Sequence, residues 1–462
     1  MTIERTYIPL SMILSATEGS IATNDYEQVI TSVTTDSRDV KEGMLFIALR
    51  GENFDGNDYV KSAIEKGASF ALAEKVPAGL EDKVIQVKDS LQALGALAAA
   101  YRQSLPMKIV GVTGSVGKTT TKEFIYAVLS EKYRTHKTDG NHNNHIGLPM
   151  SLLGADASYE AAVYEMGMNH KNEISYLTRI VRPDVAVITN IGTMHIGNLG
   201  SREAICEAKL EILEGLSEEG GIILNGDEPL LSGIRRAYYV AENNRDADMN
   251  ITHIREGENG SAFDLTIGGE RVESIVIPTK GKHNVFNAAL AYAVGCYFGM
   301  GEFEIRRGLL NFRQTGMRQK IYPYQDLTII EDCYNAGPES TKASLRVLCD
   351  EAKRNGTRAV AVLGEMRELG EHAPYLHKEV GRFAASASVD HLFILASYAP
   401  EMTEGALLGG MDEKSITILP EQYADAAEKI VSLLAPHDTV LFKASRSLRF
   451  ETLLEEVKKR RL

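Results

Sequence analysis

The segment 111–120, GVTGSVGKTT, has the residue types and spacing of a phosphate-binding loop. Glycines let backbone N–H groups turn toward phosphate oxygens, and the helix that follows adds a favourable field for an anion. Lys118 would reach the terminal phosphates of a nucleotide, and the Thr119 hydroxyl would bind Mg²⁺. The alternative is a Gly-rich turn before a solvated lysine. The apolar strand pattern before the loop and the helical pattern after it make that alternative weak.

The loop departs from the general pattern G-x-x-x-x-G-K-[ST] at one position. That pattern requires a glycine at 112, where this chain has Val112. The glycines stand instead at 111, 114 and 117. The predicted ATP contacts in the loop are Thr113, Gly114, Ser115, Val116, Gly117, Lys118, Thr119 and Thr120.

Two further polar side chains follow segments that are predicted strands. Glu165 lies at the end of 161–166 (AAVYEM), and His195 follows 184–190 (DVAVITN). Ligands of open α/β sheets bind at the carboxyl ends of the strands, so both side chains are expected beside the phosphate loop. Both could serve a Mg²⁺ site, although Mg²⁺ prefers oxygen ligands. From spacing alone, a capping carboxylate and an incidental loop histidine remain equally open.

Lys209 lies in REAICEAKLEILEG, which has helical spacing. Glutamates at positions 203, 207, 211 and 214 surround it in sequence. Glu and Lys at such spacings are typical of an exposed, ion-paired helix face. The pattern alone therefore predicts a solvated lysine.

The elements that would position these residues form three groups. Short apolar runs at 45–49, 69–73 and 83–87 predict a small N-terminal α/β domain, followed by a helix at 90–104. Strands at 161–166, 184–190 and 221–225 alternate with helices and predict a mostly parallel central sheet. A second alternating series begins near 313–320 and predicts a separate doubly wound, Rossmann-like domain. The predicted boundaries are 1–88, 89–313 and 314–462.

Composition excludes several classes of protein. At about 150 residues per domain, 462 residues suggest three domains. The net charge of -13 disfavours nucleic-acid binding, which needs a basic face. The four cysteines form no CxxC pair, as in proteins of a reducing compartment. No apolar run reaches the ~20 residues of a membrane span, and MTIERTYIPLSMILSATEGS lacks a signal-peptide pattern. A cytoplasmic monomer is expected.

Taken together, the motifs resemble those of the Mur ligases. The resemblance covers nearly the whole chain, and its motifs are specific as a set and weak singly. They are TTDSR (34–38), FDGND (54–58), GVTGSVGKTTTKE, GNHNNHIGLP (140–149), YEMG (164–167), TNIGTMH (189–195), EAKLE (207–211), KHNVFNAALA (282–291), GMRQ (316–319), DCYNAGPES (332–340), LGEMRELGEH (363–372) and KASRSLRFE (443–451).

The resemblance implies an N-terminal domain that holds the UDP end of a substrate, a central ATPase and a C-terminal Rossmann-like domain. Within the family, the blocks NHNNHIGLP, DCYNAGPES and LGEMRELGEH resemble those of members that join D-Ala-D-Ala to UDP-N-acetylmuramoyl-tripeptide. Such an enzyme uses ATP and Mg²⁺ and acts in peptidoglycan synthesis, and so in cell shape and cell division.

The resemblance also implies residue roles. Lys118, Glu165, His195 and Lys209 would be catalytic, with Lys209 carbamylated, and Thr119, Glu165, His195 and Lys209 would serve the metal sites. Asn287 would recognise adenine, and Arg318, Asp332 and Asn335 would reach ATP from the C-terminal side. The implied substrate contacts are Thr35, Asp36, Ser37, Arg38, Asn143, Asn144, Ser445 and Arg446. Ala444 departs from the family's usual glycine, which puts the fit of the incoming dipeptide in question.

The implied chemistry is activation of a carboxylate as an acyl-phosphate, followed by attack of an amine. Alternatives within the superfamily are a ligase that adds another amino acid to a UDP-muramyl peptide, and folylpolyglutamate synthase. Alternatives of other classes are a P-loop kinase or ATP-driven switch, and a binding protein without turnover. Phosphate release that requires both ligase substrates would separate these classes.

Overall fold

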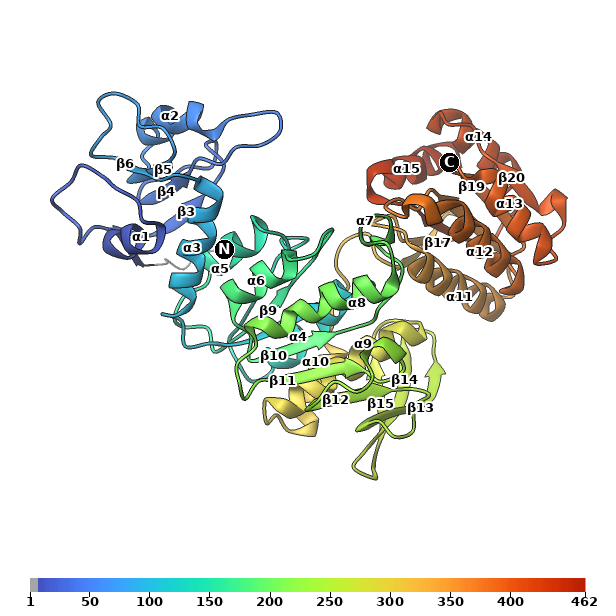
Figure 1. Cartoon of the computed structure of the whole chain (residues 1–462). Helices are drawn as coiled ribbons and strands as arrows, with labels where there is room; N and C mark the ends of the chain where they lie inside the picture. Colours follow the sequence, from blue (N-terminus) through green and yellow to red (C-terminus); the bar gives the residue numbers. More distant parts are fainter. Residues whose placement is uncertain (1–6, 462) are drawn as a thin grey trace.

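The computed structural model describes residues 7–461 and contains three α/β domains (Figure 1). Residues 1–6 and Leu462 lie outside the described residues. Residues 1–6 begin both the predicted N-terminal domain and the segment that was interpreted as lacking a signal-peptide pattern. Leu462 is the last residue of the predicted C-terminal domain. The predicted fold class, three α/β domains with mostly parallel sheets, is confirmed. The exact boundaries stay a prediction.

The N-terminal domain has a parallel four-stranded sheet in the order β3-β4-β5-β6. Asp89 caps the last helix of this region by accepting from the N–H groups of Leu91 and Gln92, which satisfies two donors of its first turn. The elements are β1 (Ile8–Pro9), α1 (Leu10–Thr17), β2 (Val29–Ile30), β3 (Ser32–Thr34), β4 (Met44–Ile47), η1 (Gly56–Tyr59), α2 (Val60–Glu65), β5 (Phe70–Ala73), β6 (Val84–Gln86) and α3 (Ser90–Arg102).

The central domain has a nine-stranded sheet in the order β15-β14-β13-β12-β11-β10-β7-β9-β8. Strands β7 to β13 pair in parallel, and β13, β14 and β15 add antiparallel hairpins that the sequence pattern did not reveal. The strands are β7 (Lys108–Thr113), β8 (Thr135–Lys137), β9 (Ala161–Glu165), β10 (Val185–Ile188), β11 (Gly221–Asn225), β12 (Ala237–Ala241), β13 (Met249–Glu256), β14 (Ser261–Ile267) and β15 (Glu270–Ile277).

Helices cover both faces of this sheet. Alternate residues of β7 point to opposite faces: Val110 and Val112 face the core of α4, α9 and α10, whereas Ile109 belongs to the core with α3, α5 and α6. The helices are α4 (Lys118–Leu129), α5 (Gly147–Leu153), α6 (Glu173–Val181), α7 (Ile196–Leu199), α8 (Arg202–Leu210), η2 (Glu211–Gly215), η3 (Pro229–Leu231), α9 (Lys282–Tyr297) and α10 (Glu302–Leu310).

The C-terminal domain has a six-stranded sheet in the order β16-β17-β21-β18-β19-β20, parallel except for the edge strand β16. The elements are β16 (Lys320–Tyr324), β17 (Leu327–Glu331), α11 (Pro338–Asn355), β18 (Ala359–Gly364), η4 (Gly370–His372), α12 (Ala373–Ser386), β19 (His391–Leu395), α13 (Ala399–Leu408), η5 (Glu413–Ser415), β20 (Ile416–Ile418), α14 (Tyr423–Leu433), β21 (Thr439–Lys443), η6 (Arg446–Leu448) and α15 (Phe450–Arg460).

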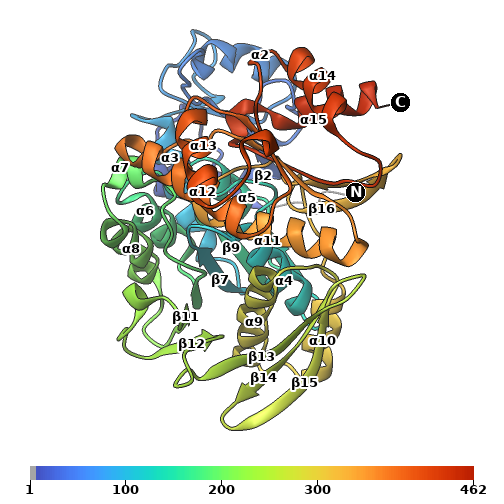
Figure 2. The same cartoon turned by 90° about the vertical axis from the view of Figure 1, so that its right-hand side faces the viewer.

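The central and C-terminal domains meet along α11 and along α7. In Figures 1 and 2, α7 reaches toward the C-terminal domain. Lys280 of the central domain pairs with Glu351 of α11 at 2.6 Å, and both side chains are largely buried. Arg354 of α11 reaches back to Glu256 of β13 at 3.4 Å. No helix in residues 7–461 is long and apolar enough to cross a membrane.

Candidate active site

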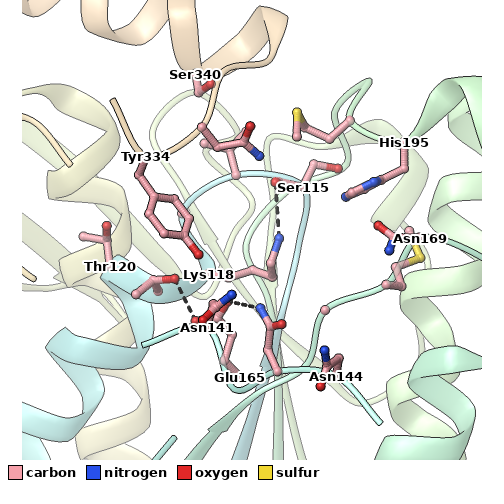
Figure 3. A pocket seen from close by; sticks show the side chains of 18 of the residues that line it. Ser115, Lys118, Thr120, Asn141, Asn144, Glu165, Asn169, His195, Tyr334 and Ser340 are labelled. Carbon is pink, nitrogen blue, oxygen red and sulfur yellow. Dashed lines mark hydrogen bonds between the residues drawn. The ribbon is translucent and has the colours of Figure 1, made fainter. Parts of the chain in front are cut away.

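A cavity of about 750 Å³ lies where the central and C-terminal domains meet. Its walls come from the phosphate loop, from 141–145 and 165–177, and from C-terminal segments that include Tyr334 and Ser340. Figure 3 shows Lys118 pointing into this space, with Tyr334 and Ser340 above it and His195 opposite Tyr334. The strand order reverses at β7, whose neighbours are β9 and β10, so the cavity opens at a switch point of the sheet.

The phosphate loop joins β7 to α4, as predicted. Gly114 and Gly117 have φ of 147° and 87°, a region that residues with a Cβ rarely adopt. A Cβ on Gly114 would lie 1.9 Å from Thr189 Oγ1, so this glycine is needed for close packing as well. Val112 is a residue of β7, paired with Glu165 of β9. Position 112 therefore belongs to the strand and not to the turn, which explains why this chain has valine where the general pattern has glycine.

A second segment, TNIG at 189–192, holds the phosphate loop in place. The sequence analysis did not predict this role. Asn190 Oδ1 accepts from Val116 N at 3.0 Å, and Asn190 Nδ2 donates to Val116 O at 2.9 Å. The Thr189 hydroxyl donates to the same carbonyl at 2.6 Å, and Ser115 Oγ accepts from Gly192 N at 2.9 Å. The signals in the sequence were the family motif TNIGTMH and its place at the end of a predicted strand, and neither indicated contacts with the phosphate loop.

We expect Asn190→Ala to weaken ADP binding by up to about 30-fold, because it removes two hydrogen bonds to Val116 that each contribute about 1 kcal/mol. Isothermal titration calorimetry with ADP measures the change. Asn198→Ala is the matched control, since the Asn198 side chain is exposed and donates to Asn169 O, away from Val116. An unchanged Kd in folded Asn190→Ala protein would contradict the supporting role.

Glu165 is the last residue of β9 and is 2% exposed. Its Oε2 accepts from Thr119 Oγ1 at 2.7 Å, and its Oε1 accepts from Asn143 Nδ2 at 2.8 Å. Its backbone N donates to Thr138 Oγ1. The structure therefore brings together two oxygen-bearing side chains, Thr119 and Glu165, in the chemistry that Mg²⁺ prefers. Residues 7–461 contain no cluster of three or more His, Cys, Asp or Glu side chains that could hold a metal.

Lys118 begins α4, and its Nζ donates to Gly114 O at 2.8 Å. Burial lowers the pKa of Lys118, and Arg318 lowers it further, whereas Glu165 and Glu368 oppose the shift. An amine bent back onto its own loop can turn to a phosphate oxygen when a nucleotide enters.

Lys209 is 1% exposed, so the solvated helix face that its spacing predicted is wrong. Helix α8 buries the face that carries Ile205, Cys206, Ala208 and Lys209. Burial lowers the pKa of Lys209 well below its ordinary value, and the charge of Lys118 lowers it further. Within residues 7–461, Cys206 is the group found to oppose this shift, and no carboxylate does so. Burial disfavours the charged form of an amine, so the neutral form of Lys209 is reached at lower pH than in an ordinary lysine.

His195 lines the cavity in a left-handed backbone conformation, with φ of 65°. Its Nδ1 lies 2.7 Å from Glu368 Oε2 of the C-terminal domain. Interaction with His195 lowers the pKa of Glu368. The predicted position beside the phosphate loop agrees with this placement, but the contact with Glu368 was not foreseen.

The predicted nucleotide residues of the two domains line the same cavity. Asn287 is buried against the loop, where its Oδ1 lies 2.7 Å from the site of a Cβ on Gly117. Arg318 stacks on Tyr334 with its guanidinium carbon 3.6 Å from the ring centre. Asp332 and Asn335 line the opposite wall. Thr113 and Gly114 do not line the cavity, and the Thr113 hydroxyl donates to Met166 O instead.

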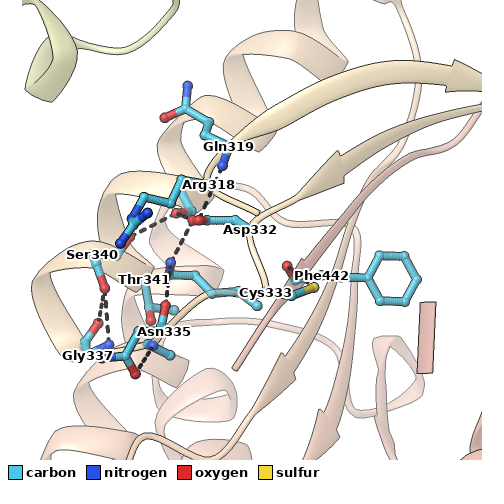
Figure 4. A network of polar contacts seen from close by, with 12 residues as sticks. Arg318, Gln319, Asp332, Cys333, Asn335, Gly337, Ser340, Thr341 and Phe442 are labelled. Atoms are coloured by element: carbon cyan, nitrogen blue, oxygen red, sulfur yellow. Dashed lines mark hydrogen bonds and ion pairs between the residues drawn. The ribbon is translucent and has the colours of Figure 1, made fainter. Parts of the chain in front are cut away.

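Asp332 belongs to a network within the C-terminal domain (Figure 4). Its Oδ2 accepts from Ser344 Oγ and from Lys443 Nζ, both at 2.6 Å, and its Oδ1 accepts from Gln319 N at 3.2 Å. Lys443 also donates to Asn335 O at 3.0 Å. Through these bonds Lys443 fixes Asp332 and Asn335 at the cavity wall. The sequence analysis did not propose Lys443 as a site residue.

The predicted substrate residues fall in three places. Asn143 and Asn144 line the cavity. Thr35, Asp36, Ser37 and Arg38 lie in the N-terminal domain outside the cavity lining, with Arg38 paired to Asp36. Ser445 and Arg446 also lie outside that lining. The Ser445 hydroxyl accepts from Arg367 N at 2.8 Å, and Arg446 pairs with Glu451.

Ala444 is fully buried in the C-terminal core. A Cβ on Gly364 would lie 2.5 Å from the Ala444 methyl and 3.1 Å from the Phe450 ring. The methyl that replaces the family's usual glycine therefore occupies space left by Gly364, inside the domain.

We expect Gly364→Ala to lower the free energy of unfolding by about 1–3 kcal/mol through overpacking. Exchanging the methyl group in the double variant Gly364→Ala, Ala444→Gly should restore most of the loss, because one methyl group again fills the space. Urea denaturation of the two variants and of Ala444→Gly measures the effect. Equal stability of the wild type and Gly364→Ala would refute the contact.

Three models of the same family match successive parts of the chain. They are "Mur ligase family, catalytic domain" at 29–102, "Mur ligase middle domain" at 112–295, and "Mur ligase, glutamate ligase domain" at 317–446. The UDP-N-acetylmuramoyl-tripeptide--D-alanyl-D-alanine ligase of Bacillus subtilis (strain 168) is 41% identical over 453 residues, or 96% of this chain and 97% of that protein.

Solved structures agree over the full length. A crystal structure of MurF from Acinetobacter baumannii is 31% identical with a TM-score of 0.90, covering 98% of this chain and 99% of its own. MurF ligase from Thermotoga maritima in complex with ADP is 29% identical with a TM-score of 0.82, covering 93% and 97%. With this similarity added to a phosphate loop at the domain junction, the chain belongs to the Mur ligase family of ATP-dependent, ADP-forming ligases.

Proposed function

We propose that this chain joins D-Ala-D-Ala to UDP-N-acetylmuramoyl-tripeptide, which gives the pentapeptide precursor of peptidoglycan. The observation that carries the proposal is the end-to-end similarity to the Bacillus subtilis ligase of that name, 41% identical over 96% of the chain. The cavity between the central and C-terminal domains supports it, because nucleotide and acceptor would meet there. Such an enzyme acts in the cytoplasm, where its nucleotide-linked substrate is made, and its product serves cell-wall growth and cell division.

The chemistry requires activation of a carboxylate. A carboxylate oxygen of the tripeptide attacks the γ-phosphorus of ATP, the bond to the β-phosphate oxygen breaks, and ADP leaves. The amine of D-Ala-D-Ala then attacks the acyl carbon, loses a proton, and expels inorganic phosphate from the tetrahedral intermediate. The atoms balance as ATP, carboxylate and amine giving ADP, phosphate and amide.

Lys118 would turn from Gly114 O to the transferring phosphoryl group and offset the charge that develops there. Asn143 would orient the acceptor, since it already positions Glu165 in the cavity. Arg318, Asp332 and Asn335 would hold the nucleotide from the C-terminal side, so that the seated domain excludes water from the acyl-phosphate. Asn287 would contact adenine beside the loop.

The residues present fit a magnesium-dependent reaction. Thr119 and Glu165 would hold one Mg²⁺, and His195 with a carbamylated Lys209 would serve a second position. When bound, the ion neutralises phosphate charge during transfer. The lowered pKa of the buried Lys209 amine supports the carbamate, because only a neutral amine can add to CO₂. The product is an anion that could serve as an oxygen ligand.

The N-terminal residues Thr35, Asp36, Ser37 and Arg38 would hold the UDP end of the acceptor, outside the main cavity. Ser445 and Arg446 would lie near the incoming dipeptide. We take 1–88, 89–313 and 314–462 as the domains that carry these parts.

Phosphate and ADP release, measured with and without D-Ala-D-Ala while mass spectrometry follows the product, tests the proposal. Release that requires both substrates, with the pentapeptide appearing, is the expected result. Both the lysine and the diaminopimelate tripeptide should be offered. If a folded preparation makes product only with another amine or a shorter UDP-linked acceptor, the chain is a different Mur-type ligase. Release of phosphate without either substrate would indicate an ATP-driven switch.

A further inference from the structure

The loop 191–199 connects the active site to the C-terminal domain through Glu368. His195 Nδ1 lies 2.7 Å from Glu368 Oε2, and Gly197 N donates to Glu368 O at 3.1 Å. A Cβ on Gly197 would lie 2.5 Å from Gly370 N, so the two backbones are in direct contact. Glu368 thus meets this loop with both its side chain and its main chain.

A second contact fixes the same loop from α11. Glu339 Oε1 accepts from both the N–H and the hydroxyl of Thr193, each at 2.9 Å. A Cβ on Gly337 would lie 2.0 Å from the sulfur of Met194. The C-terminal domain therefore holds the loop on both sides of His195.

His195 and Glu368 share an unusual backbone conformation. Their φ angles are 65° and 67°, in the left-handed region that costs a residue with a Cβ about 1 kcal/mol or more. Such strain persists only where the surrounding structure enforces it. Here the two strained residues face each other across a domain junction.

The contact between Glu368 and His195 fixes the orientation of the imidazole ring. A histidine ring rotates over a broad range about χ2, so a ring in a loop needs a partner to hold one orientation. The His195 side chain is 14% exposed and lines the cavity, and its Nδ1 is engaged by Glu368, which leaves Nε2 for the cavity. The two atoms are in ion-pair contact at 2.7 Å without meeting the geometry of a hydrogen bond. Carboxylates commonly fix functional histidines in this way.

We propose that Glu368 is a positioning residue, supplied by the C-terminal domain, that orients His195 so that the active site is complete only when this domain is seated on the loop 191–199. The proposal rests on the ligase function given above and deepens it. In this proposal, docking of the C-terminal domain changes the phosphoryl-transfer site through the orientation of His195.

The sharpest test is a double-mutant cycle between Glu368→Gln and His195→Ala. If Glu368 acts through His195, Glu368→Gln should lower kcat by about 10–100-fold in the wild type and have little effect in the His195→Ala background. The KM for ATP should stay within about twofold, because the nucleotide contacts are intact. Glu371→Gln is the matched control: it removes a carboxylate from the same loop, three residues on, and should leave kcat unchanged.

A second readout does not depend on turnover. Mn²⁺ binding in the presence of ADP, followed by electron paramagnetic resonance, should weaken by about tenfold in Glu368→Gln and stay unchanged in Glu371→Gln. Glu368→Asp keeps the charge and should lie between Gln and the wild type. The Glu368 side chain is 46% exposed, so these variants should fold.

Additive losses of kcat in the cycle, or unchanged Mn²⁺ binding in Glu368→Gln, would overturn the positioning role. An equal rise in KM for ATP, for the UDP-linked acceptor and for D-Ala-D-Ala would overturn it too, because it indicates a merely structural loss of domain contact. If the wild type makes no pentapeptide, the proposed substrate fails. The Mn²⁺ titration of the same variants still decides the role of Glu368.

Discussion

Lys118→Ala should abolish ligation, with a fall in kcat of at least about 10³-fold, while the protein stays folded. Lys118 lies at the start of α4 inside the cavity, and no other cation within residues 7–461 occupies that position on the loop. Removing it leaves the transferring phosphoryl group without its nearest protein charge. Because burial lowers the pKa of this amine, folding carries a cost for holding it, so its removal should not lower stability.

Product formation by mass spectrometry and the melting temperature are measured on the same preparation. Lys132→Ala is the control, since Lys132 lies just past the other end of α4 and donates to Gly299 O at the surface. That variant should retain full activity. Ligation by folded Lys118→Ala protein at more than about a hundredth of the wild-type rate would remove Lys118 from the mechanism.

Lys209→Met should cost about 10²–10³-fold in kcat, the second largest effect expected. Methionine keeps an unbranched apolar chain one atom shorter than that of lysine, and it cannot form a carbamate. Burial and the nearby Lys118 lower the pKa of Lys209, so more of its amine is neutral near pH 8 than for an ordinary lysine. Carbamate formation needs that neutral form and should therefore increase as the pH rises from 7 to 9.

Carbon-13 NMR of protein equilibrated with ¹³C-bicarbonate follows the modification directly. The wild type should show a carbamate signal that grows with pH and that Lys209→Met lacks, whereas Lys132→Met should leave it unchanged. Wild-type activity should fall in carbonate-free buffer and return when bicarbonate is added. A Lys209→Met protein with wild-type turnover would exclude the carbamate from catalysis.

The sequence predicted the positions of the loop 111–120, Glu165 and His195 correctly, because these positions follow from local rules. An apolar strand, a glycine-rich turn and a helix start can be recognised from nearby residues, and the carboxyl ends of parallel strands share one edge. The antiparallel hairpins β13 to β15 were not recognised, because their edge position leaves many residues exposed and weakens the alternation of apolar residues.

Lys209 shows where local reasoning fails. Its neighbours in the helix are glutamates at ion-pairing spacings, yet the face that carries it is covered by the rest of the domain. Burial of a helix face depends on distant elements, which residue spacing does not encode. The same holds for Lys443 and Glu368, which reach the cavity or its rim only because the C-terminal domain folds against the central one.

The support of the phosphate loop by Thr189 and Asn190 has a consequence for binding kinetics. Because these side chains already fix the Val116 peptide, an incoming nucleotide has little loop entropy to remove. A preformed loop imposes no population penalty on association. The on-rate for ADP should therefore be governed by how often the gap between the central and C-terminal domains admits a nucleotide, and osmolytes or crowding agents that favour compact domain arrangements should slow entry and exit together.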